Sequence, residues 1–163
     1  MRKLIFILTL IILVILQATV LNYFNIFNVR PDLLLISVII TSLFFPPLLA
    51  ISLSISAGIL KDIFSINAFG MNTPLFFLWS FLIIKLSRKI TFDTDYIRLA
   101  LIFVIAILNN IITRLILLFF GNPVSLGIFL RIVFIESLYT VIISLLVLKF
   151  APNLSSISRQ QVR

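Results

Sequence analysis

The chain has 163 residues, of which 62% are hydrophobic and only 11% are charged, and its formal net charge is +8. Soluble domains have about 45–50% apolar residues, and a chain this apolar could not keep its surface out of water. The composition therefore predicts an all-α, polytopic membrane helix bundle, with room for about six transmembrane helices of ~20 residues. Because the sequence contains neither Cys nor His, disulfides, thiol nucleophiles and zinc sites are excluded, and we expect no metal and no cofactor.

The basic residues lie beside apolar runs, where contact with the anionic cytoplasmic leaflet accounts for them. We therefore expect membrane lipids, and no nucleic acid, as their partner. With the N-terminus inside, the outer segments hold Arg30 and Lys61, whereas the cytoplasmic segments hold Arg2, Lys3, Lys85, Arg88, Lys89, Arg98, Lys149, Arg159 and Arg163. The positive-inside rule then places both termini in the cytoplasm, with residues 1–154 as the membrane domain and 155–163 as a short polar tail.

The predicted helices follow one another with turn signals between them. An apolar run behind two basic residues predicts an uncleaved first helix over residues 4–24. Arg30-Pro31-Asp32 is typical of a helix start, because proline suits the first turn and the helix dipole favours an acidic residue there. Further helices are expected over 33–45, 48–60, 74–84, 97–120 and 124–150.

Two of these helices are short and flank Pro46-Pro47. Residues 33–45 and 48–60 would each span roughly 20 Å, less than a ~30 Å hydrocarbon core. Either they are two short spans joined by a tight cytoplasmic turn, or they form a re-entrant hairpin. We prefer two spans, because Arg30-Pro31-Asp32 and residues 61–64 can extend them at the outer interface.

Small residues recur every four positions in the second of these helices. Ala50, Ser54 and Gly58 share one helix face, and Asp62 continues the spacing. Such a ladder lets another helix approach closely in lipid. Gly70 and Asn72 then indicate a tight polar turn. We expect a packing surface with a mixed role that favours a partner protein, and leave open a neighbouring helix of the same chain.

Polar residues also lie inside the predicted fifth and sixth helices: Asn109, Asn110, Arg114, Arg131 and Glu136. Ionisable residues are costly there and normally face protein or water. Both Asn residues are expected at the depth of Glu136, the deepest charge. We therefore predict that Glu136 fastens the sixth helix to the fifth, with a proton or ligand relay as the alternative.

An enzymatic function is not expected. Without His or Cys, catalysis would need Asp, Glu, Lys or Ser, and the sequence has no nucleophile–base pattern and no phosphate-binding glycine-rich loop. Asp93 and Asp95 lie near basic residues and are interpreted as part of a solvated loop.

Three short motifs together resemble a known family. Arg30-Pro31-Asp32 is followed by three Leu residues, then by the pair Gly58 and Asp62, and then by Gly70 and Asn72. In this order and spacing the motifs resemble the bacterial rod shape-determining protein family MreD, over roughly residues 28–89. The remainder of the chain is similar to the family only in hydropathy.

The resemblance implies a non-enzymatic, multi-pass scaffold of the bacterial cytoplasmic membrane that helps to maintain cell shape and to organise peptidoglycan synthesis. Its implied partner is an MreC-like bitopic membrane protein, and wall-synthesis enzymes and an actin-like filament protein are further candidates. The family is also similar in fold to the substrate-binding subunits of energy-coupling factor vitamin transporters. A subunit of that kind is therefore the alternative function.

Overall fold

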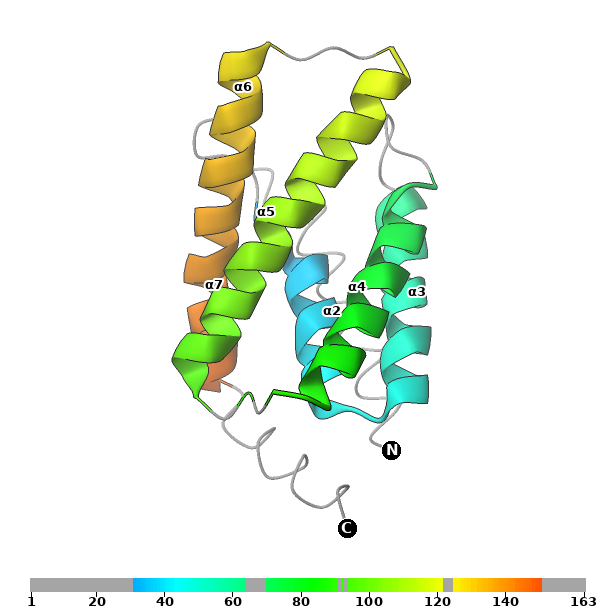
Figure 1. The fold of residues 1–163 in the computed structure, drawn as a ribbon, viewed down its shortest axis with the longest axis vertical. Helices are drawn as coiled ribbons and strands as arrows, with labels where there is room; N and C mark the ends of the chain where they lie inside the picture. The colour runs from blue at the N-terminus through cyan, green and yellow to red at the C-terminus, as the bar shows by residue number, and fades with distance from the viewer. Residues whose placement is uncertain (1–30, 64–69, 91, 93, 122–124, 151–163) are drawn as a thin grey trace.

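The structure, a computed structural model, describes residues 31–63, 70–90, 92, 94–121 and 125–150. Within these ranges every regular element is helical (Figure 1): α2 Leu33–Phe44, α3 Pro47–Ile63, α4 Asn72–Ser87, α5 Asp95–Phe119, α6 Leu126–Arg131, η2 Ile132–Glu136 and α7 Ser137–Phe150. The expected all-α fold is therefore confirmed for the described part. The predicted helix over 4–24, the tail 155–163, Arg30 and Asp93 lie outside the described residues.

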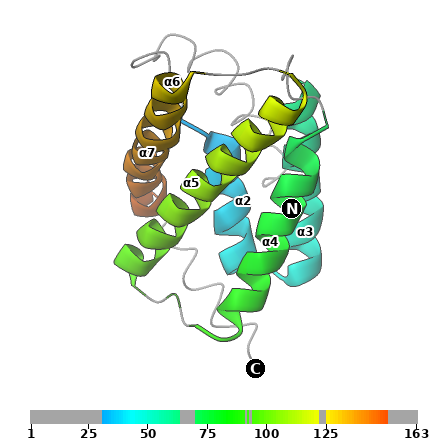
Figure 2. The ribbon, with the colours of Figure 1, turned by 45° about the horizontal axis from the view of Figure 1, so that its top comes forward.

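The helices pack in two groups. α2, α3 and α4 contact one another, and α5 packs along η2 and α7, with sparser contacts between the two groups. Figures 1 and 2 show α5 crossing the bundle obliquely between the α6–α7 run and α4. One hydrophobic core joins the two groups. It contains side chains of α2 together with Phe76 and Trp79 of α4 and Ile102 and Ile105 of α5.

In the described part of the chain, two helices are long and apolar enough to cross a membrane: Asp95–Phe119 and Gly127–Leu145. α2 and α4 are apolar but shorter, with 12 and 16 residues. Large apolar side chains stay exposed on the outside of α4, α5 and α7, among them Phe81, Val104 and Ile142. An exposed apolar surface of this kind is typical of a surface that contacts a membrane or another protein.

The turn between α2 and α3 follows from its two prolines. Phe45 is extended, as expected before a proline, with φ −112° and ψ 159°. Pro47 begins α3, where its missing N–H costs nothing and its fixed φ suits a helix. α3 then continues to Ile63, so the expected extension of residues 48–60 toward Lys61 is confirmed as far as Ile63.

α2 begins well inside the bundle. The expected position of the Arg30-Pro31-Asp32 turn at the outer interface stays a prediction, and its Asp32 lies in the interior of the bundle. That residue is 4% exposed, and its amide donates to Thr140 Oγ1 at 3.2 Å, in the interior of the α6–α7 run. The cause is the length of α2, whose 12 residues span only about 18 Å from the Pro46 turn. Figure 1 accordingly shows the start of α2 near mid-height of the bundle.

The run 124–150 is not one regular helix. The segment Ile132–Glu136 is π-helical and lies between α6 and α7. A π-turn holds one more residue than an α-turn, so it rotates all later side chains about the helix axis. Hydropathy carries no signal for such a turn, and we did not predict it.

α3 and α4 approach each other closely at Gly58. A Cβ built on this residue would lie 2.5 Å from Thr73 Cα and 3.0 Å from Thr73 N. Both are backbone atoms, so no side-chain rotation could relieve the clash. Glycine is therefore required here because the start of α4 occupies the space of its missing side chain.

We predict that Gly58→Ala lowers the free energy of unfolding by about 1–3 kcal/mol, the usual cost of overpacking. Gly127→Ala is the matched control, because Gly127 is also helical and nothing lies within 4 Å of the added Cβ. It should be neutral or slightly stabilising, since Ala has the higher helix propensity. Unfolding in mixed detergent micelles measures both, and equal stability of the two variants would contradict the close approach.

Candidate functional site

The carboxylate of Asp62 closes the junction between α3 and α4. Its Oδ1 accepts from the amide of Asn72 at 2.9 Å and from Asn72 Nδ2 at 2.8 Å. Its Oδ2 accepts from the amide of Thr73 at 3.0 Å and from Thr73 Oγ1 at 2.6 Å. The first amides of a helix have no partner within that helix, and Asp62 therefore acts as a cap supplied from another helix.

The cap connects two of the motifs on which the family resemblance is based, Gly58 with Asp62 and Gly70 with Asn72. Gly58 and Asp62 are one turn apart on α3, so the glycine admits the backbone of α4 and the carboxylate binds its end. Gly70 has φ +81°, a left-handed conformation that favours glycine, and it turns the chain into α4. Asn72 is 2% exposed and donates both its amide and its side-chain nitrogen to Asp62.

The small-residue face of α3 is filled by the chain itself. Ala50, Ser54 and Ala57 are completely buried, and Asp62 is 4% exposed. α3 contacts α4 more extensively than it contacts any other described helix. Of the two occupants considered for this face, the structure shows the neighbouring helix of the same chain. The preference for a partner protein at Ala50, Ser54, Gly58, Asp62 and Asn72 is thereby corrected, and Gly70 is exposed at the turn.

A partly buried ion pair joins α2 to α3. Lys61 Nζ donates to Asp32 Oδ2, while Asp32 Oδ1 caps α2 by accepting from the amide of Leu35 at 3.0 Å. The Lys61 ammonium also lies 5.0 Å from the centre of the Phe76 ring, within the range of a cation–π interaction. Together with the bond to Thr140, Asp32 thus connects α2, α3 and α7.

The two asparagines of α5 bind different helices. Trp79 Nε1 of α4 donates to Asn109 Oδ1 at 3.1 Å. Asn110 Nδ2 donates to Ser137 Oγ of α7 at 3.4 Å, and Ser137 Oγ donates in turn to the carbonyl of Val133. The two amides therefore tie α5 to both of its neighbours.

Glu136 does not bind either asparagine of α5 through a hydrogen bond, and its predicted role in fastening the sixth helix to the fifth stays a prediction. Among the described residues we find no hydrogen bond to its carboxylate, and Asn110 instead binds the next residue, Ser137. The π-turn that ends at Glu136 changes the rotation of the helix and brings Ser137 to face α5. The half-buried Glu136 is acted on electrostatically by Asp32, Lys61 and Arg114.

The two remaining predicted polar residues, Arg114 and Arg131, differ in their exposure to solvent. Arg114 of α5 is half-buried, whereas Arg131, the last residue of α6, is exposed. Within the described residues, no group of three or more His, Cys, Asp or Glu side chains could hold a metal ion.

Sequence reasoning missed the partners of the predicted residues. The pair formed by Lys61 and Asp32 spans 29 positions, and the pair formed by Trp79 and Asn109 spans 30. The pair of Lys61 and Asp32 could have been found from the sequence. A buried charge needs an opposite partner, and the chain offers Lys61 only five acidic residues to choose from. No comparable signal marked Thr73, Ser137 or Thr140.

The chain was compared with protein-family models, with curated proteins and with solved structures, and nothing matched in any of the three comparisons. The site is therefore interpreted from its own contacts.

We predict that Lys61→Met lowers the free energy of unfolding by about 3 kcal/mol, because it removes the ammonium that pairs with the buried Asp32 carboxylate. Asp32→Asn should cost less, since Asn keeps an oxygen that can cap the amide of Leu35. The double variant should cost less than the sum of the two, and a double-mutant cycle of unfolding measures this coupling.

The matched control for this cycle is Lys85→Met, which removes an exposed ammonium from the end of α4. It should change stability by less than about 0.5 kcal/mol. Additive costs for Lys61→Met and Asp32→Asn would show that the ion pair contributes nothing.

Proposed function

We propose that this chain is a non-enzymatic scaffold of the bacterial cytoplasmic membrane, similar in role to the MreD family. In this proposal the chain crosses the membrane six times, has both termini in the cytoplasm and binds an MreC-like bitopic protein. Through that partner it helps to maintain cell shape and to organise peptidoglycan synthesis during elongation. Wall-synthesis enzymes and an actin-like filament protein are the more distant partners.

The observation that carries the proposal is that the three motifs of the resemblance act together in the fold. Asp32 pairs with Lys61, and the next residue, Asp62, caps α4 at Asn72 and Thr73. Gly58 and Gly70 supply the space and the turn that this cap requires. Motifs that form one connected unit are a stronger basis for a family resemblance than three separate short matches.

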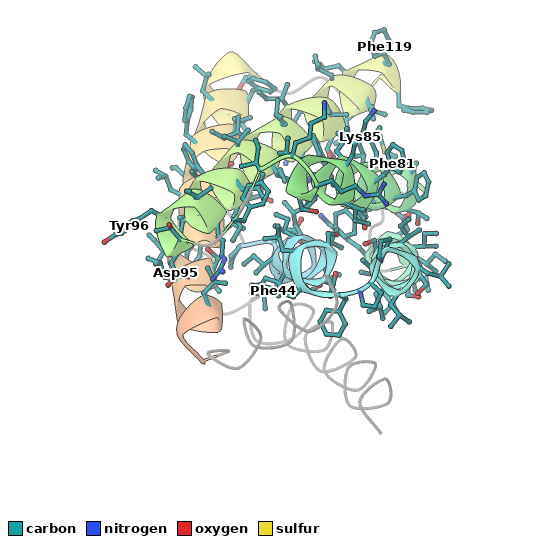
Figure 3. The ribbon with its side chains drawn as sticks, turned by 60° about the horizontal axis from the view of Figure 1, so that its bottom comes forward. Phe44, Phe81, Lys85, Asp95, Tyr96 and Phe119 are labelled. Carbon is teal, nitrogen blue, oxygen red and sulfur yellow. The ribbon has the colours of Figure 1, made fainter. Side chains whose placement is uncertain are left out.

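The outer surface also supports the membrane location. Tyr96 and Phe119 are 82% and 91% exposed near the two ends of α5 (Figure 3), a helix of 25 residues that measures about 37 Å. Aromatic side chains are enriched at both membrane–water interfaces, and the apolar side chains between them suit the hydrocarbon core. Since the small-residue face of α3 is buried, the proposed partner binds one of these outer faces.

A second candidate function rests on Glu136. A half-buried carboxylate with no hydrogen bond to another described residue, on which the charges of Asp32 and Lys61 act, is unusual in a membrane helix. It also ends a π-turn, a feature frequent at functional sites. These observations favour the substrate-binding subunit of an energy-coupling factor type vitamin transporter as the alternative.

The two functions predict different co-purifying molecules. The chain is extracted from bacterial membranes in a gentle detergent, purified with its partners, and analysed by mass spectrometry for proteins and small molecules. The scaffold predicts a bitopic membrane protein at a fixed ratio in both the unmodified chain and Glu136→Gln. A stoichiometric vitamin-like molecule that disappears in Glu136→Gln, without a bitopic protein, would contradict the scaffold and favour the transporter subunit.

A further inference from the structure

One exposed stripe of α4 combines aromatic and basic side chains. Phe77, Phe81 and Lys85 recur every four residues and therefore share one face of the helix. The two rings are 43% and 51% exposed and stack with their centres 6.5 Å apart. Lys85 is exposed as well, and Figure 3 shows Phe81 and Lys85 on the side of α4 that is turned away from α2.

The basic end of the stripe is extended by Arg88 and Lys89, which follow Lys85 by one turn and are also exposed. The cation at the start of α5 is used differently. Arg98 donates to Asp95 Oδ1 at 2.7 Å and to the carbonyl of Phe92 at 2.8 Å, and it lies 5.1 Å from the centre of the Phe44 ring. Among the described side chains at this end of the bundle, the positive charge offered to a ligand is thus concentrated at the end of α4.

We infer that this stripe is a binding site for an anionic phospholipid. The phosphate contacts Lys85, Arg88 and Lys89, and an acyl chain lies along Phe77 and Phe81. The distance from Phe77 to Lys85 along the helix is about 12 Å, which fits within one leaflet of a ~30 Å hydrocarbon core. The inference rests on the membrane location in the proposed function, and it adds a ligand that the scaffold role does not require.

Charge complementarity selects the class of lipid. A zwitterionic lipid offers the same acyl chain to the two rings, but its headgroup carries no net charge for the three cations. Each Lys or Arg near an anionic membrane surface raises binding roughly fivefold. We therefore expect a preference of at least tenfold for an anionic over a zwitterionic headgroup at this site.

The test places a fluorescent reporter on the stripe. The indole introduced by Phe81→Trp lies on the exposed face, whereas the native Trp79 is 5% exposed and bound to Asn109, and so is shielded from lipid. The full chain is reconstituted in phosphatidylcholine vesicles that carry a small fraction of brominated phosphatidylglycerol or, in parallel, brominated phosphatidylcholine. Bromine quenches an indole that its acyl chain contacts, and we expect several-fold stronger quenching by the anionic lipid.

Two variants separate a site from general attraction to the protein. Val104→Trp places the reporter on an exposed position of α5 that is 51% exposed, and both lipids should quench it equally. Replacing Lys85, Arg88 and Lys89 by Gln in the Phe81→Trp background should bring the ratio of the two quenching efficiencies close to one. Lys85→Gln alone should lower that ratio at least twofold, which keeps the test decisive when the triple variant does not fold.

Equal quenching of Phe81→Trp by the two lipids would overturn the site, and so would an unchanged ratio in Lys85→Gln. The same anionic preference at Val104→Trp would overturn it as well, because lipid would then be enriched around the whole protein. A chain that does not enter the vesicles overturns the site together with the membrane location. Failure of the scaffold function is distinguishable, because loss of the bitopic partner would leave the quenching ratio unchanged.

Discussion

The fold depends on one carboxylate that is shared between two helices. Asp62 belongs to the last turn of α3, yet both of its oxygens bind the first residues of α4. Buried amides at a helix start have no water to bind, so an internal acceptor replaces the solvent. The close approach at Gly58 is the steric condition for this contact, and a larger residue there would move α4 away from its cap.

The same rule extends to Asp32 and to the two asparagines of α5. Asp32 accepts a hydrogen bond from the amide of Leu35 at the start of its own helix, and it also pairs with the ammonium of Lys61. A single carboxylate thus binds both a helix-start amide and a positive charge. The asparagines of α5 bind α4 and α7. These polar contacts connect helices whose apolar faces would allow sliding or rotation, since apolar packing alone is weakly directional. They therefore fix the register of the bundle.

The sequence carried enough information for the described helices and for the residues that matter most in packing. Hydropathy and the two prolines located α2, α3 and α5 to within a few residues. α4 begins at Asn72, two residues before its expected start, because its first amides are capped by the distant Asp62. The partner of each polar residue could not be predicted, since pairs about 30 positions apart depend on helix rotation. The π-turn then altered that rotation and replaced Glu136 by Ser137 opposite Asn110.

Hydrogen exchange of two backbone amides tests the central claim most directly. Amides in the first turn of a helix normally exchange fast, because no residue of that helix accepts from them. If the Asp62 carboxylate binds the amides of Asn72 and Thr73, nuclear magnetic resonance of the full chain in lipid nanodiscs should show both of them strongly protected. The amide of Tyr96, in the exposed first turn of α5, serves as the unprotected reference. Exchange of Asn72 and Thr73 as fast as that of Tyr96 would contradict the cap and the account of the fold built on it.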